Sequence, residues 1–224
     1  MAVQARGGVY AAVGLHPTHV DDEGFDPDTY RTLARSSPRV VAIGETGLDY
    51  YRLPPGREME TLEKQREVFR QHLALAAELN LPLVVHCREA RKSAATVAYR
   101  ELHRLLQSEG RAVGRQLRGV VHCFLGTVAE ARAFLELGFY IGITGIVTFA
   151  TGAEQVRAVA RAVPLDHLLI ETDSPYLSPE PHRGRRAVVP DEASVEHVRA
   201  VGGQRQLEQR AGEAGARLDE REDG

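Results

Sequence analysis

The 224-residue sequence has few of the residues that mark secreted, membrane or zinc-ribbon proteins. It contains two cysteines, Cys87 and Cys123, and no C-x-x-C pair. This spacing indicates neither a disulfide framework nor a zinc ribbon, and it is typical of a reducing cytoplasm. No apolar run approaches the roughly 20 residues that span a bilayer, and the N-terminal stretch lacks an apolar core of signal-peptide length. We therefore expect a cytoplasmic protein with no membrane partner.

Long basic runs and phosphate-binding glycine loops are also absent. The formal net charge is -3, so the overall field does not favour nucleic acid, and any such contact must be local. No G-x-G-x-x-G or G-K-[ST] motif occurs, which weakens the case for a nucleotide-binding open sheet. With 43% hydrophobic and 26% charged residues, a chain of this length favours one large globular domain.

What the sequence does contain is a regular alternation of short aliphatic runs and longer polar stretches of helical period. Strands that are aliphatic on both faces and are joined by helices predict a parallel sheet, either open or closed into a barrel. The missing phosphate loop favours the barrel. The six predicted strands lie within "VYAAVGLHP", "RVVAIGETGLDY", "LPLVVHCREA", "RGVVHCFLG", "FYIGITGIV" and "HLLIETDSPYL".

Three of the intervening helices have clear signals. Between residues 56 and 80 one predicted apolar face consists of Met59, Leu62, Phe69, Leu73 and Ala76. A T-x-x-E capping box and a closing glycine bound a second helix, at Thr127, Glu130 and Gly138. The third spans residues 152–163, with Val156, Val159, Ala160 and Val163 facing inward.

Polar side chains follow the predicted strands. His16, Glu45, His86, His122 and Asp173 each come after an aliphatic run. In parallel α/β folds the carboxyl ends of the strands form the ligand-binding edge, and in a barrel they converge on one mouth. Imidazoles and carboxylates gathered there suit Zn, Mn or Mg, and a carboxylate can bridge two such ions. The sequence therefore predicts a divalent metal site at the mouth.

Each of these residues also has a simpler interpretation. A single histidine at a strand end is more often a polar side chain that donates to a carbonyl group. The repeated "VVHC" at residues 84–87 and 120–123, combined with acids after other strands, is what favours metal binding. Strand alternation directs Cys87 and Cys123 away from the mouth, as core residues. For Glu171 two interpretations stay open: it is either a partner of the site or a solvated group at its rim.

Five stretches of the sequence together resemble the TatD family. They are "VGLHP", "AIGETGLDYY", "PLVVHCREA", "GVVHCFLG" and "ETDSPYL", and they occur in the family's order between about Val9 and Arg186. The resemblance implies a metal-dependent deoxyribonuclease of the amidohydrolase class, built on a TIM (β/α)8 barrel. It also implies two divalent ions and a DNA or oligonucleotide substrate.

The resemblance assigns a role to each candidate residue. Glu45 resembles the bridging carboxylate, and His86 and His122 resemble ligands of one metal. Asp173 resembles the catalytic aspartate that holds or orients the attacking water at the other metal. His16 resembles the histidine near the substrate phosphate. Arg88 is a second candidate substrate-binding residue by its bidentate geometry, although a surface salt bridge is an equal alternative.

The sequence departs from the family pattern at both ends. The H-x-H pair of the family's first strand does not occur, and a (β/α)8 barrel takes roughly 30 residues for each of its units. We therefore expect an incomplete barrel of about six strands over residues 1–186, with one of its two ions bound weakly. Residues 187–224 have few sizeable apolar side chains, which predicts a poorly ordered tail.

Three functions are compatible with these features. The first is a metal-dependent phosphodiester hydrolase that acts on DNA. The second is a related amidohydrolase that cleaves a C–N or ester bond with the same metal chemistry. The third is a non-catalytic remnant. The basic turn "HRGRR" at residues 182–186 leans toward a polyphosphate substrate.

Overall fold

The computed structural model describes residues 9–90 and 97–187. The predicted tail therefore lies outside the described residues, apart from residue 187. The elements follow one another as β1 (Ala11–Val13), α1 (Pro27–Arg35), β2 (Val40–Asp49), α2 (Glu58–Leu79), β3 (Leu83–Arg88), α3 (Val97–Ala112), β4 (Gly119–Val121), α4 (Val128–Glu136), β5 (Tyr140–Ile143), α5 (Glu154–Ala162) and β6 (Leu168–Ile170). Short 3-10 helices cover Pro17–His19, Gly145–Thr148 and Leu165–His167.

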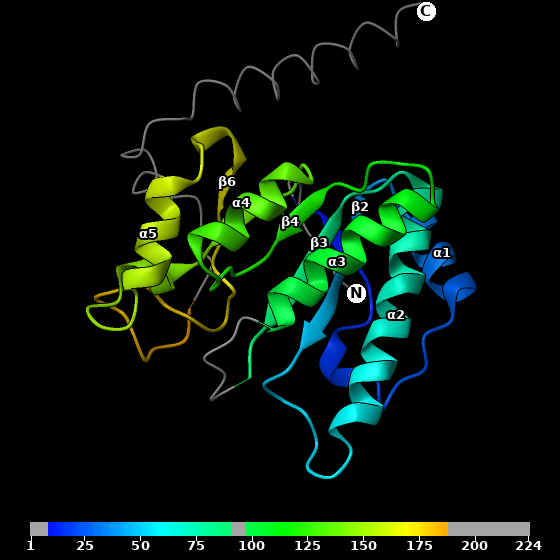
Figure 1. Ribbon diagram of the computed structural model, residues 1–224, viewed down its shortest axis with the longest axis horizontal. Coiled ribbons are helices and arrows are strands. Elements are labelled where there is room, and N and C mark those ends of the chain that lie inside the picture. Colours follow the sequence, from blue (N-terminus) through cyan, green and yellow to red (C-terminus); the bar gives the residue numbers. More distant parts are fainter. Residues whose placement is uncertain (1–8, 91–96, 188–224) are drawn as a thin grey trace, which may run out of the picture. The chain divides into compact units, whose positions relative to one another are not determined.

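The six strands form one parallel sheet in the order β1-β2-β3-β4-β5-β6. All six predicted strands are confirmed, and the helices lie outside the sheet (Figure 1). Within the described residues β1 and β6 do not pair with each other, so the barrel is not closed. The architecture is that of an incomplete (β/α)8 barrel. None of the described helices is long and apolar enough to cross a membrane.

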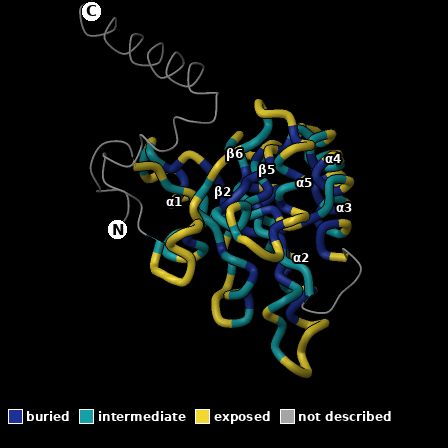
Figure 2. Tube along the Cα trace, turned by 90° about the vertical axis from the view of Figure 1, so that its left-hand side faces the viewer, coloured by how far each residue is buried: buried dark blue, intermediate teal, exposed yellow. Residues whose placement is uncertain are grey.

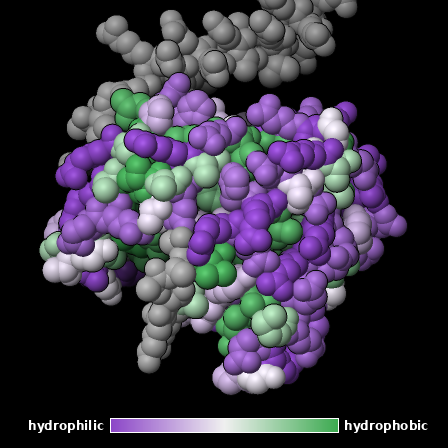
Figure 3. All heavy atoms as spheres, in the orientation of Figure 1, coloured by the Kyte–Doolittle hydropathy of each residue, from purple (hydrophilic) through white to green (hydrophobic). Residues whose placement is uncertain are grey.

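The core lies between the strands and the inner faces of the helices, as the dark central strands in Figure 2 show. Phe69 and Leu73 of α2, Leu102 of α3 and Phe134 of α4 are fully enclosed there. Their helices turn polar residues outward, and the face in Figure 3 is mostly hydrophilic with scattered apolar patches. This division between faces is what the 3.6-residue period predicts.

The predicted helix signals are mostly confirmed. Thr127 and Glu130 form the reciprocal capping box of α4, and Gly138 follows that helix with a φ of 83°. The prediction that Met59 belongs to the inward face of α2 is wrong, because this residue lies in the first turn and is 70% exposed. In α5, Val156 and Val159 are buried, whereas Ala160 is only half-buried.

Strand β6 is less buried than an aliphatic run in a parallel sheet is expected to be. Leu169 is 42% exposed and Ile170 is 64% exposed. The physical reason is the position of β6 at the edge of the described sheet, where it pairs with β5 alone. The acidic stretch that follows therefore begins from a partly exposed strand.

Candidate metal centre

One cavity of about 420 Å³ is lined by all six site residues predicted from the sequence. They are His16, Glu45, His86, Arg88, His122 and Asp173. They come from the segments that follow β1, β4 and β6 and from β2 and β3 themselves. Because His16 follows the first described strand and Asp173 follows the sixth, the sheet curls enough to bring its two ends to one cavity.

Glu45 lies within a strand, whereas the sequence placed it at a strand end. Strand β2 continues to Asp49, and its register with β3 shifts between Gly44 and Thr46, so that Glu45 has no partner in β3. Such a bulge changes the direction of a side chain and is frequent beside active sites. Gly44 allows the close approach, since its φ is 148° and a Cβ there would collide with the backbone oxygen of Val84.

Three donor atoms converge at the bulge. Nδ1 of His86 lies 2.8 Å from Oε1 of Glu45, and Nε2 of His16 lies 3.3 Å from the same His86 nitrogen. The third separation, between His16 Nε2 and Glu45 Oε1, is 3.6 Å. A tetrahedral ion with bonds of about 2.0–2.1 Å holds its ligand atoms about 3.4 Å apart. These three donor atoms, two from imidazoles and one from a carboxylate, are therefore spaced to fit a small divalent cation.

His16 has a hydrogen bond that bears on its role. The backbone N–H of Thr18 donates to Nδ1 of His16 at 3.2 Å, and the Thr18 hydroxyl lies 2.7 Å from the same nitrogen. When Nδ1 accepts, a neutral imidazole carries its proton on Nε2. That nitrogen is then a donor toward the cavity, which suits a substrate oxygen better than a metal ion.

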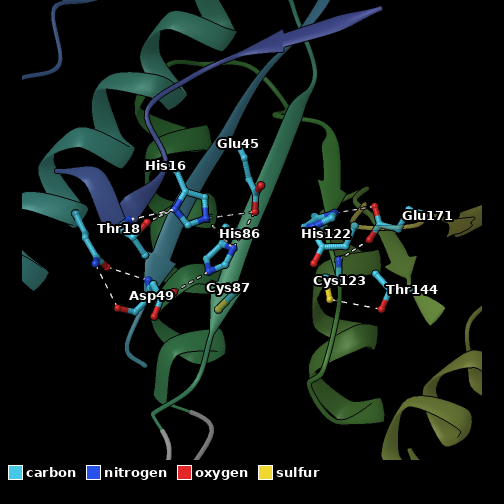
Figure 4. A network of polar contacts seen from close by, with 12 residues as sticks. His16, Thr18, Glu45, Asp49, His86, Cys87, His122, Cys123, Thr144 and Glu171 are labelled. Carbon is cyan, nitrogen blue, oxygen red and sulfur yellow. Dashed lines mark hydrogen bonds and ion pairs between the residues drawn. The ribbon is translucent and has the colours of Figure 1, made fainter. Parts of the chain in front are cut away.

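A second group of polar contacts lies across the cavity, as Figure 4 shows for His122 and Glu171. Nε2 of His122 lies 3.2 Å from Oδ1 of Asp173, and its Nδ1 lies 2.8 Å from Oε2 of Glu171. Asp173 has a φ of 55°, a left-handed conformation that aspartate adopts more readily than most residues. Glu171 is therefore a partner of the site, which the sequence had left open.

Burial and charge act in opposite directions on these groups. Burial alone would lower the pKa of His122, but hydrogen bonds to Asp173 and Glu171 outweigh it and raise the pKa to about 10. The pKa of His86 is likewise raised, because contacts with Asp49 and Glu45 outweigh its burial. Burial would raise the pKa of Glu45, yet the hydrogen bonds from His16 and His86 lower it. These shifts favour an ionised Glu45 next to a cationic His86.

The structure adds two residues that the sequence reasoning missed. Asp49 is fully buried and contacts His86, and Arg52 lines the cavity. The available signal for Asp49 was an acid at the end of an aliphatic strand, the same signal that drew attention to Asp173. Both cysteines line the cavity, contrary to the prediction that strand alternation keeps them away from it. Cys87 is nevertheless buried in the core as predicted, whereas Cys123 is only partly buried and its Sγ lies 3.6 Å from the Thr144 hydroxyl.

Comparisons with known proteins agree with this geometry. The family model described as TatD related DNase matches residues 1–204. The uncharacterized metal-dependent hydrolase YcfH of Escherichia coli K12 is 44% identical over 183 residues, which cover 82% of this chain and 62% of YcfH. A 3'-5' ssDNA/RNA exonuclease TatD of Pantoea vagans is 39% identical over 186 residues, with 83% and 65% covered.

A solved structure supports the same relationship. The TatD homologue YjjV of Escherichia coli K12 superposes with a TM-score of 0.63 at 30% identity, over 80% of this chain and 62% of YjjV. The chain spans less than two thirds of the length of these relatives. The family model matches most of the sequence, and the relatives share both its sequence and its parallel fold. The chain therefore belongs to the TatD family of metal-dependent hydrolases.

Proposed function

We propose that the protein is a divalent-metal-dependent phosphodiester hydrolase that acts on DNA or a short oligonucleotide. The observation that carries the proposal is the shared cavity, in which two groups of imidazole and carboxylate donors are accompanied by Arg52 and Arg88. The donors suit Mg, Mn or Zn, and the guanidinium groups suit a phosphate. Two free cysteines among the described residues are consistent with a reducing cytoplasm.

Glu45, His86, His122 and Asp173 are the residues that would hold metal ions. Glu45 is suited to contact two ions because it projects from the β2 bulge and has a carboxylate with two oxygens. A bound divalent ion would supply Lewis-acid stabilisation of the phosphate charge and a lower pKa for water. In the family pattern two ions would be present.

Asp173, His16 and Arg88 would handle the substrate and the water. Asp173 is one-third exposed, so its carboxylate can accept a hydrogen bond from an attacking water and hold the oxygen in place. His16 would donate from Nε2 to a phosphate oxygen, in agreement with its hydrogen bond from Thr18. The guanidinium of Arg88 would bind a neighbouring phosphate oxygen, with bidentate geometry available.

Support for a nucleic-acid substrate comes from two sources. One relative in the comparison is named a 3'-5' ssDNA/RNA exonuclease, and two arginines line the same cavity as the donors. The formal charge of the chain is -3, so attraction of a polyanion must come from these local side chains.

The test is cleavage of a single-stranded oligonucleotide labelled at one end, with Mg or Mn added to the metal-free protein. His86→Ala and His122→Ala should each lose most of the activity, since each removes one of few imidazole donors. Arg132→Ala on the exposed face of α4 serves as the control. Turnover at the unmodified rate in both histidine variants would remove these residues from the site.

Related amidohydrolase chemistry is the second candidate, because the same donors would also activate water toward a C–N or ester bond. Parallel assays with bis(p-nitrophenyl) phosphate and p-nitrophenyl acetate distinguish the two reactions. A preference for the phosphodiester supports the nuclease proposal, and a preference for the acetate supports the alternative. Absence of both activities in protein that binds no metal would support the non-catalytic remnant.

A further inference from the structure

Two carboxylates outside the proposed donor set each contact a histidine of the site, on the side of the ring that faces away from the cavity. Asp49 is the last residue of β2, and Glu171 follows β6 directly. Each accepts a hydrogen bond from the ring nitrogen that points away from the donor carboxylate on the other side of the ring. Figure 4 shows both pairs, on opposite sides of the cavity.

The two ring nitrogens exchange roles between His86 and His122. In His86, Nδ1 faces Glu45 at 2.8 Å while Nε2 faces Oδ2 of Asp49 at 3.3 Å. In His122, Nε2 faces Asp173 at 3.2 Å while Nδ1 faces Oε2 of Glu171 at 2.8 Å. The nitrogen directed into the cavity is therefore Nδ1 in one ring and Nε2 in the other.

The supporting carboxylates are themselves fixed by backbone donors. Oδ1 of Asp49 accepts the N–H groups of Tyr51 and Arg52, each at 2.8 Å, and its side chain is fully buried. Oxygen Oε1 of Glu171 accepts the N–H of Cys123. In each carboxylate one oxygen is held by the backbone, which leaves the other to accept a hydrogen bond from the imidazole N–H.

The Glu171 carboxylate also needs a neighbour without a side chain. Gly142 of β5 lies against its carboxylate, and a Cβ at that position would collide with Oε1. A glycine is therefore required here by the close approach and not by its φ, which lies outside the left-handed region. The position of the Glu171 carboxylate is thus determined by β5 and by the segment that follows β4.

We propose that Asp49 and Glu171 are positioning residues that set the tautomers of the two histidines, so that His86 presents Nδ1 and His122 presents Nε2 to a cation. The proposal rests on the proposed metal-dependent function. A carboxylate that accepts one ring N–H leaves the opposite nitrogen unprotonated and directs it at the ion. The two histidines then bind a cation through different nitrogens although both follow the same "VVHC" pattern.

Amide variants test this directly, because they keep shape and reverse one hydrogen bond. In Asp49→Asn the backbone N–H groups of Tyr51 and Arg52 require the amide oxygen at their side, so the NH₂ group faces His86 Nε2. The ring must then accept at Nε2 and keep its proton on Nδ1, which blocks the metal. In Glu171→Gln the N–H of Cys123 imposes the same reversal on His122.

The readout is the identity of the nitrogen that binds cadmium in protein with ¹⁵N-labelled histidine. One-bond coupling to ¹¹³Cd should appear at Nδ1 of His86 and at Nε2 of His122. Asp49→Asn should lose the first coupling and keep the second, and Glu171→Gln should do the opposite. Calorimetric titration with Zn should show a loss of affinity of about 10–100-fold in each variant.

Asp26→Asn is the matched control, since Asp26 caps α1 at an exposed position; it should leave both couplings and the Zn affinity unchanged. Thermal melting of the metal-free proteins monitors folding, and because the two variants act at separate positions, either one alone decides the proposal. Coupling to Nε2 of His86, or full Zn affinity in either amide variant, would overturn it. If the unmodified protein binds neither Cd nor Zn, both the proposed function and the present inference fail. Binding through Nε2 of His86 and Nδ1 of His122 would overturn only the present inference.

Discussion

The guanidinium carbon of Arg88 lies 4.0 Å from the centre of the Tyr51 ring. The two residues come from the end of β3 and from the segment after β2, and Arg88 also lines the cavity that holds the metal donors. A cation–π contact of this kind restricts a flexible side chain while leaving its N–H groups free to bind an anion. The pair therefore presents a positioned positive charge beside the candidate metal centre.

Arg88→Ala should raise the KM for an oligonucleotide roughly tenfold, because a charge-assisted hydrogen bond contributes about 1.5–3 kcal/mol. The value of kcat should change less, and the dependence of KM on salt should become weaker. Steady-state kinetics at two salt concentrations provide the measurement. Arg132→Ala is the control for a general loss of positive charge. An unchanged KM would place Arg88 outside substrate binding.

His16→Gln should separate metal binding from catalysis. If His16 donates to the substrate, the variant keeps the metal content of the unmodified protein and loses about 10²-fold or more in rate, since positioned donors of this kind contribute on that order. Metal analysis after dialysis and single-turnover cleavage are measured on the same sample. A parallel fall in metal content would instead identify His16 as a ligand, as its distances to Glu45 and His86 allow.

Metal retention should be unequal between the two proposed ions. On the assignment that the family resemblance implies, Glu45, His86 and His122 would hold one ion, whereas the other would have only the carboxylates of Glu45 and Asp173. Because affinity rises with the number of well-placed ligands, exhaustive dialysis should leave about one divalent ion per chain. Metal analysis by mass spectrometry, together with a nicking assay, checks this. Two retained ions with strong activity would contradict the expectation.

His72 predicts an acid-sensitive fold. Its Nδ1 lies 2.7 Å from the backbone oxygen of Val68, its Nε2 accepts the N–H of Leu15 at 3.0 Å, and it is fully buried. Burial lowers the pKa of His72 to about 4, in spite of the hydrogen bond to Val68. The unfolded chain, with a histidine pKa near 6.5, therefore binds more protons between these two values.

The sign of the effect follows from that difference. The stabilising contribution of neutral His72 is complete above about pH 6.5 and declines as the pH falls toward 4, by about 3 kcal/mol in total. Urea denaturation at several pH values measures the slope. His72→Gln should flatten it relative to the unmodified protein, and Gln71→Ala should leave it unchanged. An equal slope in His72→Gln would assign the acid sensitivity to other groups.

The sequence predicted the strands, and it singled out residues that line one cavity, because both depend on simple patterns. Aliphatic residues such as Leu83 and Val85 are buried by the sheet they form, and polar residues after such runs meet at one edge of a parallel sheet. The capping box of α4 was readable for the same reason, since Thr127 and Glu130 interact within one turn.

Features that depend on neighbours in space were not readable. The bulge that turns Glu45 inward arises from the pairing of β2 with β3, and nothing in the local sequence fixes that register. The exposure of Ile170 depends on which strand is at the edge of the sheet. Contacts of Asp49 with His86 and of Glu171 with His122 join residues 37 and 49 positions apart, so only the folded chain reveals them.

The strand order has a consequence for how the protein is made. Each strand of the described sheet pairs with the strands that directly precede and follow it in the chain. A chain that leaves the ribosome can therefore add each new strand to an edge that already exists, without waiting for a distant segment. Asp173 follows the sixth strand and would emerge last among the candidate metal ligands. Cation binding at the complete site would thus begin only after all six described strands have been synthesised.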